Sequence, residues 1–90
     1  MTRQPFTTLP PAQQAGILCN DPQFREYVGR HCLELKWAVS DSAAAHYLRD
    51  LCRIASRREL NTDDAARRRF EALRTDFDAW AGRLARPQGR

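Results

Sequence analysis

The sequence predicts an all-α fold, a compact bundle of four to five helices in which shorter helices cover a long C-terminal helix. Apolar residues in the last third of the chain recur at alternating steps of four and three, which places them on one stripe of an α-helix. They are Ala66, Phe70, Leu73, Phe77, Trp80 and Leu84. A stripe with three large aromatic rings needs cover, so the preceding helices are expected to pack on it. The five prolines lie near expected helix starts or the chain ends, not at the regular turn spacing of a β-sandwich.

The length of 90 residues suits one domain with one modest core. We expect an N-terminal arm at 1–9, a single helical domain at 10–85 and a flexible tail at 86–90. Three cysteines without a C-x-x-C pair argue against a disulfide scaffold and favour a reducing compartment. No signal peptide is visible, and no stretch has the roughly 18 apolar residues of a membrane span. A soluble protein of the cell interior is therefore expected.

The first two helices are separated by a clear boundary. Prolines at 10–11 begin the first helix, where a missing N–H costs nothing, and it is expected over 12–19. Its core-facing residues are Ala15, Leu18 and Cys19. Asp21 then caps a second helix, expected over 22–33, and Pro22 occupies its first position.

The second helix and the segment after it carry two irregularities. Its core face is predicted to hold Phe24, Cys32 and either Val28 or Tyr27. Gly29 lies inside the helix at a cost of about 1 kcal/mol against Ala, so we expect another backbone to approach it closely. Residues 33–39 alternate apolar and polar, but an isolated strand has no partner. We therefore predict a frayed helix end followed by an extended connector.

A third helix is expected to start at Ser40. Its predicted stripe is Ala44, Leu48, Leu51 and Ala55, flanked by Tyr47, Cys52 and Ile54. Ser56 and Glu59 match a capping box, which predicts one short helical turn ending at Leu60.

The long last helix is predicted to be capped by Asn61 and Thr62. Asp63 and Asp64 would then lie in its first turn, at the positive end of the helix dipole. Ion pairs are expected at the spacings Asp63–Arg67, Asp64–Arg68 and Arg74–Asp78.

No residue set in this chain indicates a reaction, a metal site or a cofactor. His31, Cys32, His46 and either Cys19 or Cys52 include metal-ligand types, but they lack the close pairs typical of structural zinc. Buried cysteines acting as small hydrophobes are the favoured interpretation. A nucleophile also needs an activating base held by a third group, and no motif supplies that set. The sequence predicts a protein that is not an enzyme.

The candidate partner-binding residues are Arg57, Arg58, Arg67, Arg68, Arg69 and Trp37. The arginine clusters could meet phosphates, but acidic residues on the same surface also fit a solvated face of mixed charge. Trp37 lies in the connector beside Lys36. It could be an interface residue, since Trp is enriched in hot spots, although we favour a Trp folded over the core.

Three segments resemble a group of small phage and prophage proteins. Residues 11–24 resemble the opening QQAGILC-x-D-x-x-F of that group. Residues 52–62 and 70–80 resemble its later motifs I-x-S-R-x-E-L-x-T/N and F-x-x-L-x-x-x-F-x-x-W. The resemblance covers most of residues 9–84 and implies a helical fold and a setting in mobile elements. Some such reading frames lie among recombination and replication functions, and others of this size are anti-CRISPR proteins.

The function expected from this resemblance is inhibition of a host defence complex by stoichiometric binding, as an anti-CRISPR protein in the cytoplasm of a bacterial host. Its partner would be a protein or ribonucleoprotein effector, blocked in DNA binding or in a required conformational change. Mimicry of DNA is disfavoured because the net charge is +4. The alternatives are a nucleic-acid-binding accessory of phage recombination or replication, and a structural homo-oligomer.

Overall fold

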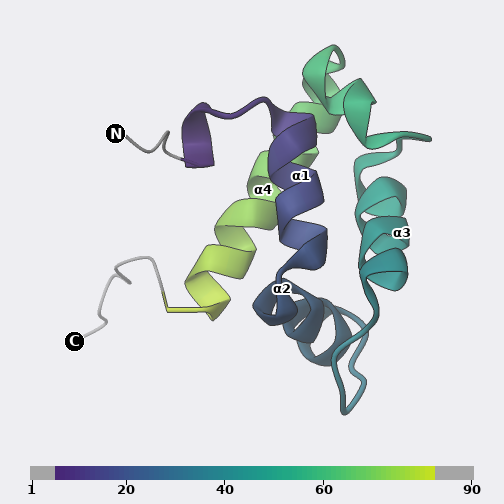
Figure 1. The fold of residues 1–90 in the computed structure, drawn as a ribbon, viewed down its shortest axis with the longest axis vertical. Helices are drawn as coiled ribbons and strands as arrows, with labels where there is room; N and C mark the ends of the chain where they lie inside the picture. The colour runs from purple at the N-terminus through teal and green to yellow at the C-terminus, as the bar shows by residue number, and fades with distance from the viewer. Residues whose placement is uncertain (1–5, 83–90) are drawn as a thin grey trace.

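The long C-terminal helix and its helical neighbours are present in the computed structural model, which describes residues 6–82 (Figure 1). The α-helices are α1 (Pro11–Asn20), α2 (Pro22–Glu26), α3 (Asp41–Cys52) and α4 (Asp64–Trp80). Short helical turns are η1 (Phe6–Thr8), η2 (Tyr27–Cys32) and η3 (Arg57–Asn61). No strand occurs among the residues that the structure describes, so the predicted all-α class is confirmed. No helix within this range is long and apolar enough to span a bilayer.

The arrangement places the short turns at the two ends of the bundle. In Figure 1, α1 and α3 stand beside each other and α4 passes behind α1. The turn η3 lies at the top, and the connector between η2 and α3 lies at the bottom. Within the expected arm, Phe6 of η1 is half-buried against the core. Residues 1–5, Leu84 and the expected tail at 86–90 lie outside the described residues.

The core forms around the predicted apolar stripe of α4. Ala66, Phe70, Leu73 and Phe77 are buried, and Trp80 is half-buried against them. The Phe77 ring meets the edge of Phe24 with centroids 5.2 Å apart and an interplanar angle of 88°. Burying a side chain of this size stabilises the fold by roughly 1.5–3 kcal/mol. The prediction that earlier helices cover this stripe is confirmed.

Two predicted caps are also confirmed, and a third lies at the predicted start of α3. Asp21 Oδ1 accepts a hydrogen bond from the backbone N–H of Gln23 at 2.9 Å, which begins α2. Ser40 Oγ accepts from the N–H of Ala43 at 3.1 Å and begins α3. The capping box at η3 is present. Each cap satisfies a backbone N–H that has no partner within the helix.

The start of α4 differs from the prediction. Its cap is Asp63, whose Oδ1 accepts from the N–H of Ala66 at 3.1 Å. Asn61 lies at the end of η3 instead, and its Oδ1 accepts from the N–H of Ala12 in α1 at 3.1 Å. The N–H of Thr62 donates to the carbonyl of Glu59. Asn61 and Thr62, which were predicted to cap α4, therefore form the end of η3 instead.

The first ion pair of α4 is also shifted. Because the Asp63 carboxylate caps the helix, Asp64 is the first-turn carboxylate that pairs with an arginine. It pairs with Arg67, three residues on, rather than with Arg68. Both spacings place side chains on neighbouring turns of a helix.

The second helix changes geometry half-way. α2 ends at Glu26 and continues as η2, a π-helical turn in which the N–H of Leu33 donates to the Val28 carbonyl at 2.9 Å. The wider turn directs both Tyr27 and Val28 into the core, although the sequence offered them as alternatives. Glu34, with φ of 58°, then begins the connector. π-Helical turns are rare and are frequent at functional sites.

Gly29 meets the backbone of the connector, as predicted. A Cβ at Gly29 would overlap the carbonyl oxygen of Trp37 and lie 3.2 Å from Cα of Ala38. The N–H of Leu35 donates to the Gly29 carbonyl at 2.8 Å, and the N–H of Val39 donates to that of Arg25 at 3.1 Å. The predicted extended connector is present and lies against η2.

The predicted stripe of α3 is partly wrong. The buried residues of α3 are Ala44, Ala45, Leu48 and Cys52. Leu51 is exposed, at 39%, because it faces away from this stripe. Ala55 is also exposed, because α3 ends at Cys52 and Arg53 turns the chain with φ of 61°.

We predict that Gly29→Ala destabilises the fold by about 1–3 kcal/mol, because the new methyl group would displace the connector backbone. Urea unfolding measures the change. Gly16→Ala is the matched control: a Cβ there has no neighbour within 4 Å, and the exchange should stabilise α1 by roughly 0.5–1 kcal/mol. Equal effects of the two substitutions would contradict this account of Gly29.

Candidate functional site

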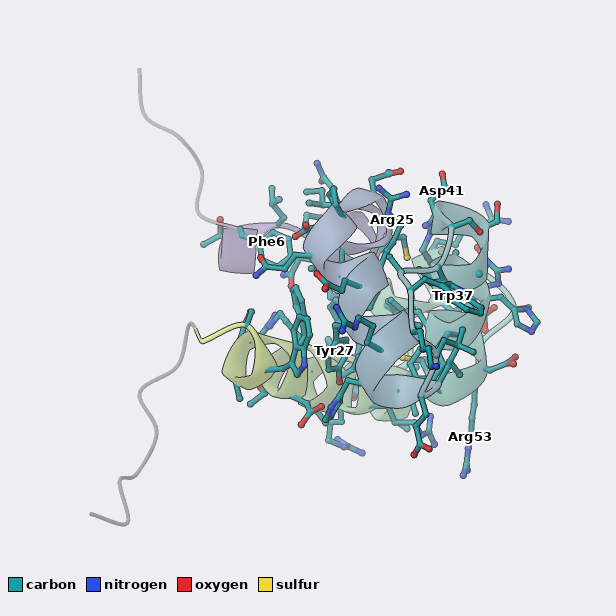
Figure 2. All side chains as sticks on the ribbon, turned by 90° about the horizontal axis from the view of Figure 1, so that it is seen from below. Phe6, Arg25, Tyr27, Trp37, Asp41 and Arg53 are labelled. Atoms are coloured by element: carbon teal, nitrogen blue, oxygen red, sulfur yellow. The ribbon has the colours of Figure 1, made fainter. Side chains whose placement is uncertain are left out.

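Trp37 does not fold over the core. Its side chain is 62% exposed, so the interpretation that we favoured for it from the sequence is wrong. The cause is local: the backbone of Trp37, not its ring, packs against Gly29. Figure 2 shows the indole on the outside of the connector. The connector lies at the end of the bundle opposite η3, so Trp37 is distant from Arg57 and Arg58 (Figure 1).

The three consecutive arginines of α4 do not form one patch, because successive helical residues point about 100° apart. Arg67 pairs with Asp64. Arg69 Nη1 donates to the backbone carbonyl of Cys52 at 3.1 Å, which satisfies the C-terminal end of α3. Arg68 is exposed. Arg69 thus has a structural role that its sequence neighbours do not share.

Arg57 and Arg58 diverge in the same way. Arg58 is exposed, and Arg57 is half-buried near the Cys19 thiol of α1, where its charge opposes the effect of burial, which raises the pKa of Cys19. The six predicted partner-binding residues are therefore distributed over the connector, η3 and separate sides of α4.

The structure instead assembles an apolar groove between η2, α3 and α4. Its volume is about 460 Å³. The lining residues are Tyr27, Tyr47, Leu51, Arg53, Arg69, Ala72, Leu73 and Asp76. Arg69 is the one predicted site residue among them. The groove is thus built from residues that are distant in the sequence.

The exposed residues that line the groove are Leu51, Arg53, Ala72 and Asp76, of which Leu51 is the large apolar residue and Arg53 the cation. Leu51 is 39% exposed, and Arg53 extends away from the body of the protein in Figure 2. The sequence analysis missed both residues. Leu51 was assigned to the buried stripe of α3, and no sequence signal marks Arg53, whose direction follows from its left-handed backbone.

A polar cluster lies at the Asp76 side of the groove. The Tyr27 hydroxyl donates to Asp76 Oδ2 at 2.5 Å, and His31 Nε2 lies 3.6 Å from the same oxygen. The His31 and Tyr27 rings stack with centroids 5.3 Å apart. Burial raises the pKa of Tyr27 well above its ordinary value of 10.0, and the hydrogen bond to Asp76 raises it further. Tyr27 thus remains a proton donor at neutral pH and holds the Asp76 carboxylate in place.

The cysteines are free thiols in different surroundings. Cys19 and Cys52 are buried, while Cys32 is half-buried near the Tyr27 and Tyr47 hydroxyls. Burial raises the pKa of Cys52 from 9.0 to about 11, against the opposing effect of the nearby Arg69. Over residues 6–82, no three His, Cys, Asp or Glu side chains gather closely enough to hold a metal ion.

We predict that Arg69→Ala lowers the free energy of unfolding by about 1–2 kcal/mol, because a hydrogen bond from a charged donor to the half-buried Cys52 carbonyl is lost. Arg68→Ala is the control and should stay within about 0.5 kcal/mol of the parent protein. Both values follow from urea unfolding at one pH. If the two variants lose the same stability, Arg69 does not act as a helix cap.

We also predict that stability falls at alkaline pH. Unfolded Cys52 ionises near pH 9, whereas folded Cys52 ionises near pH 11, so the unfolded state binds fewer protons between these values. The stability that the protonated Cys52 thiol contributes is complete below pH 9 and is lost as pH rises through 11. Unfolding curves from pH 8 upward should show a shallower loss for Cys52→Ala than for the parent, whatever the cavity costs at neutral pH. Parallel curves would contradict this prediction.

Comparison with protein-family models, curated proteins and solved structures finds no match to this chain. A functional assignment therefore depends on the geometry of the groove and on the resemblance carried by the three sequence segments.

Proposed function

We propose that this chain is a non-enzymatic binding protein that inhibits a host defence complex, as an anti-CRISPR protein, by docking through the groove between η2, α3 and α4. The groove carries the proposal because it joins an exposed apolar side chain, Leu51, to the exposed charge of Arg53. Apolar anchors flanked by polar groups are typical of protein interfaces. The resemblance to small phage proteins supplies the setting.

The occupant that fits this groove is a protein segment with an apolar side chain beside an acidic one. The apolar group would contact Leu51 and Tyr47, and the carboxylate would face Arg53. The excess of basic residues over the whole chain, +4, favours an approach by an acidic surface. A partner held in this way would be blocked sterically, or prevented from completing a movement that target binding requires.

Direct binding of nucleic acid, the alternative from another class, has less support. Several guanidinium groups of the described chain already have partners within it. These are Arg30 with Glu26, Arg67 with Asp64, Arg69 with the Cys52 carbonyl, and Arg74 with Gln14 Oε1 at 2.7 Å. A phosphate-binding surface needs several cations directed to one face. Arg58 and Arg68 remain exposed and stay candidates for contacts at the rim of an interface.

We predict that Leu51→Glu abolishes inhibition, because it places a carboxylate in the apolar groove. The assay is plasmid interference by a panel of CRISPR-Cas effectors, with and without the protein. Ile17→Glu is a matched control, because Ile17 is similarly exposed, at 45% against 39%, and lies on α1 outside the groove. Leu51→Glu should lose at least about tenfold more potency than Ile17→Glu.

Two results would contradict the proposal. The first is equal potency of the two folded variants, with folding checked by circular dichroism. The second is capture of free DNA that weakens steeply with salt, with no effector inhibited, which would favour the accessory protein of recombination or replication.

A further inference from the structure

A second recess lies on the opposite flank of α3 from the groove. Its volume is about 290 Å³. The polar and charged residues that line it are Cys19, Asn20, Asp41, Ser42, Arg49 and Arg57. Within α3, Asp41 and Arg49 are linked by steps of four residues through Ala45, which also lines the recess, whereas Leu51 follows Arg49 by about 200° of helical rotation. Figure 2 likewise places Asp41 and Arg53 on opposite sides of the protein.

Two arginines from different elements converge on this recess. Arg49 comes from α3 and Arg57 from η3, and both are half-buried. Among residues 6–82, no carboxylate lies within ion-pair distance of either guanidinium. The Cys19 thiol lines the recess beside Arg57, and a thiol is a weak acceptor. Most of the donor groups of the two side chains are therefore available to a ligand.

The recess carries a net positive charge, because its lining holds two arginines and one carboxylate. Asp41 is the one carboxylate that lines it, and its Oδ1 accepts from the N–H of Ser42 at 2.7 Å. Arg25 lies on the same side of the protein as Asp41 in Figure 2. Its buried Nε has no hydrogen-bond partner over the described part of the chain. Arg49 and Arg57 carry like charges that repel each other across the recess, and an anion between them would relieve that repulsion.

We propose that this recess binds a phosphate group. One guanidinium can pair with both oxygens of a carboxylate, so two guanidiniums from separate elements better match the additional oxygens of a tetrahedral phosphate. The Ser42 hydroxyl and the second amide hydrogen of Asn20 are further donors, since Asn20 Nδ2 gives one hydrogen to the Gly16 carbonyl at 3.2 Å. The recess accepts the phosphate either free or as a monoester, because it is open on one side and larger than the group itself.

This site goes beyond the proposed function. It shares no lining residue with the groove, and α3 separates the two. Loss of phosphate binding and loss of inhibition can therefore be measured independently in the same protein.

The test is titration of the ¹⁵N-labelled protein with inorganic phosphate, and separately with a nucleoside 5′-monophosphate, at constant ionic strength. We expect saturable shifts of the amide signals of Asn20, Ser42 and Ala45, with none at the groove residues Leu51 and Ala72. Saturation by inorganic phosphate alone identifies a free ion as the ligand. Saturation by the nucleotide at lower concentration identifies a monoester.

Arg49→Gln and Arg57→Gln should each weaken phosphate binding by at least about tenfold, because each removes one bidentate donor pair. Arg68→Gln, which removes an exposed arginine outside the recess, should leave binding unchanged. If a glutamine variant fails to fold, Arg57→Lys keeps the charge and should still weaken binding by loss of the fork geometry. Shifts no larger than those caused by chloride, or equal affinity in the parent and the Arg49→Gln/Arg57→Gln double variant, would overturn the proposal.

Discussion

The burial of one face of α4 is the constraint on which the other features depend. Phe77 lies at its centre, in edge contact with Phe24 and 5.3 Å from the ring centroid of Tyr27. These two partners come from consecutive short elements, α2 and η2, which could not bury an aromatic ring alone. The π-helical turn matters here because it admits Tyr27 and Val28 to the core together. The Tyr27 hydroxyl still donates a hydrogen bond to Asp76, so this core residue also orients one side of the groove.

The close contact between Gly29 and the connector determines where α3 lies. The connector returns along η2 with hydrogen bonds to the Gly29 and Arg25 carbonyls, and Ser40 then begins α3. The same contact turns the Trp37 side chain outward, since its backbone occupies the space beside the glycine. A residue without a side chain thus positions an entire helix. It also explains why one of the largest apolar side chains of the protein is exposed.

α3 is the element that separates two surfaces of different chemistry. One flank carries Leu51 above an apolar groove, and the other carries Arg49 in a polar recess. The proposed inhibitor function uses the first flank, and the proposed phosphate site uses the second. Arg69 holds the C-terminal end of α3 through the Cys52 carbonyl, so it stabilises the helix that carries both surfaces. A partner carrying an acidic, apolar segment and a ligand carrying phosphate would not compete for the same side chains.

Local patterns in the sequence were sufficient for the all-α class, the aromatic stripe of α4, the Asp21 cap, the capping box at η3 and the close approach at Gly29. Each of these depends on residues near one another in the chain, where spacing and backbone chemistry act directly. The groove and the recess were not predictable in this way. The sequence pattern assigns Leu51 to the core and Arg57 to the surface. The packing of α3, α4 and η3 instead exposes Leu51 and half-buries Arg57. Both surfaces consist of side chains distant in sequence, and their exposure depends on how helices rotate against one another, which periodicity within a single helix does not specify.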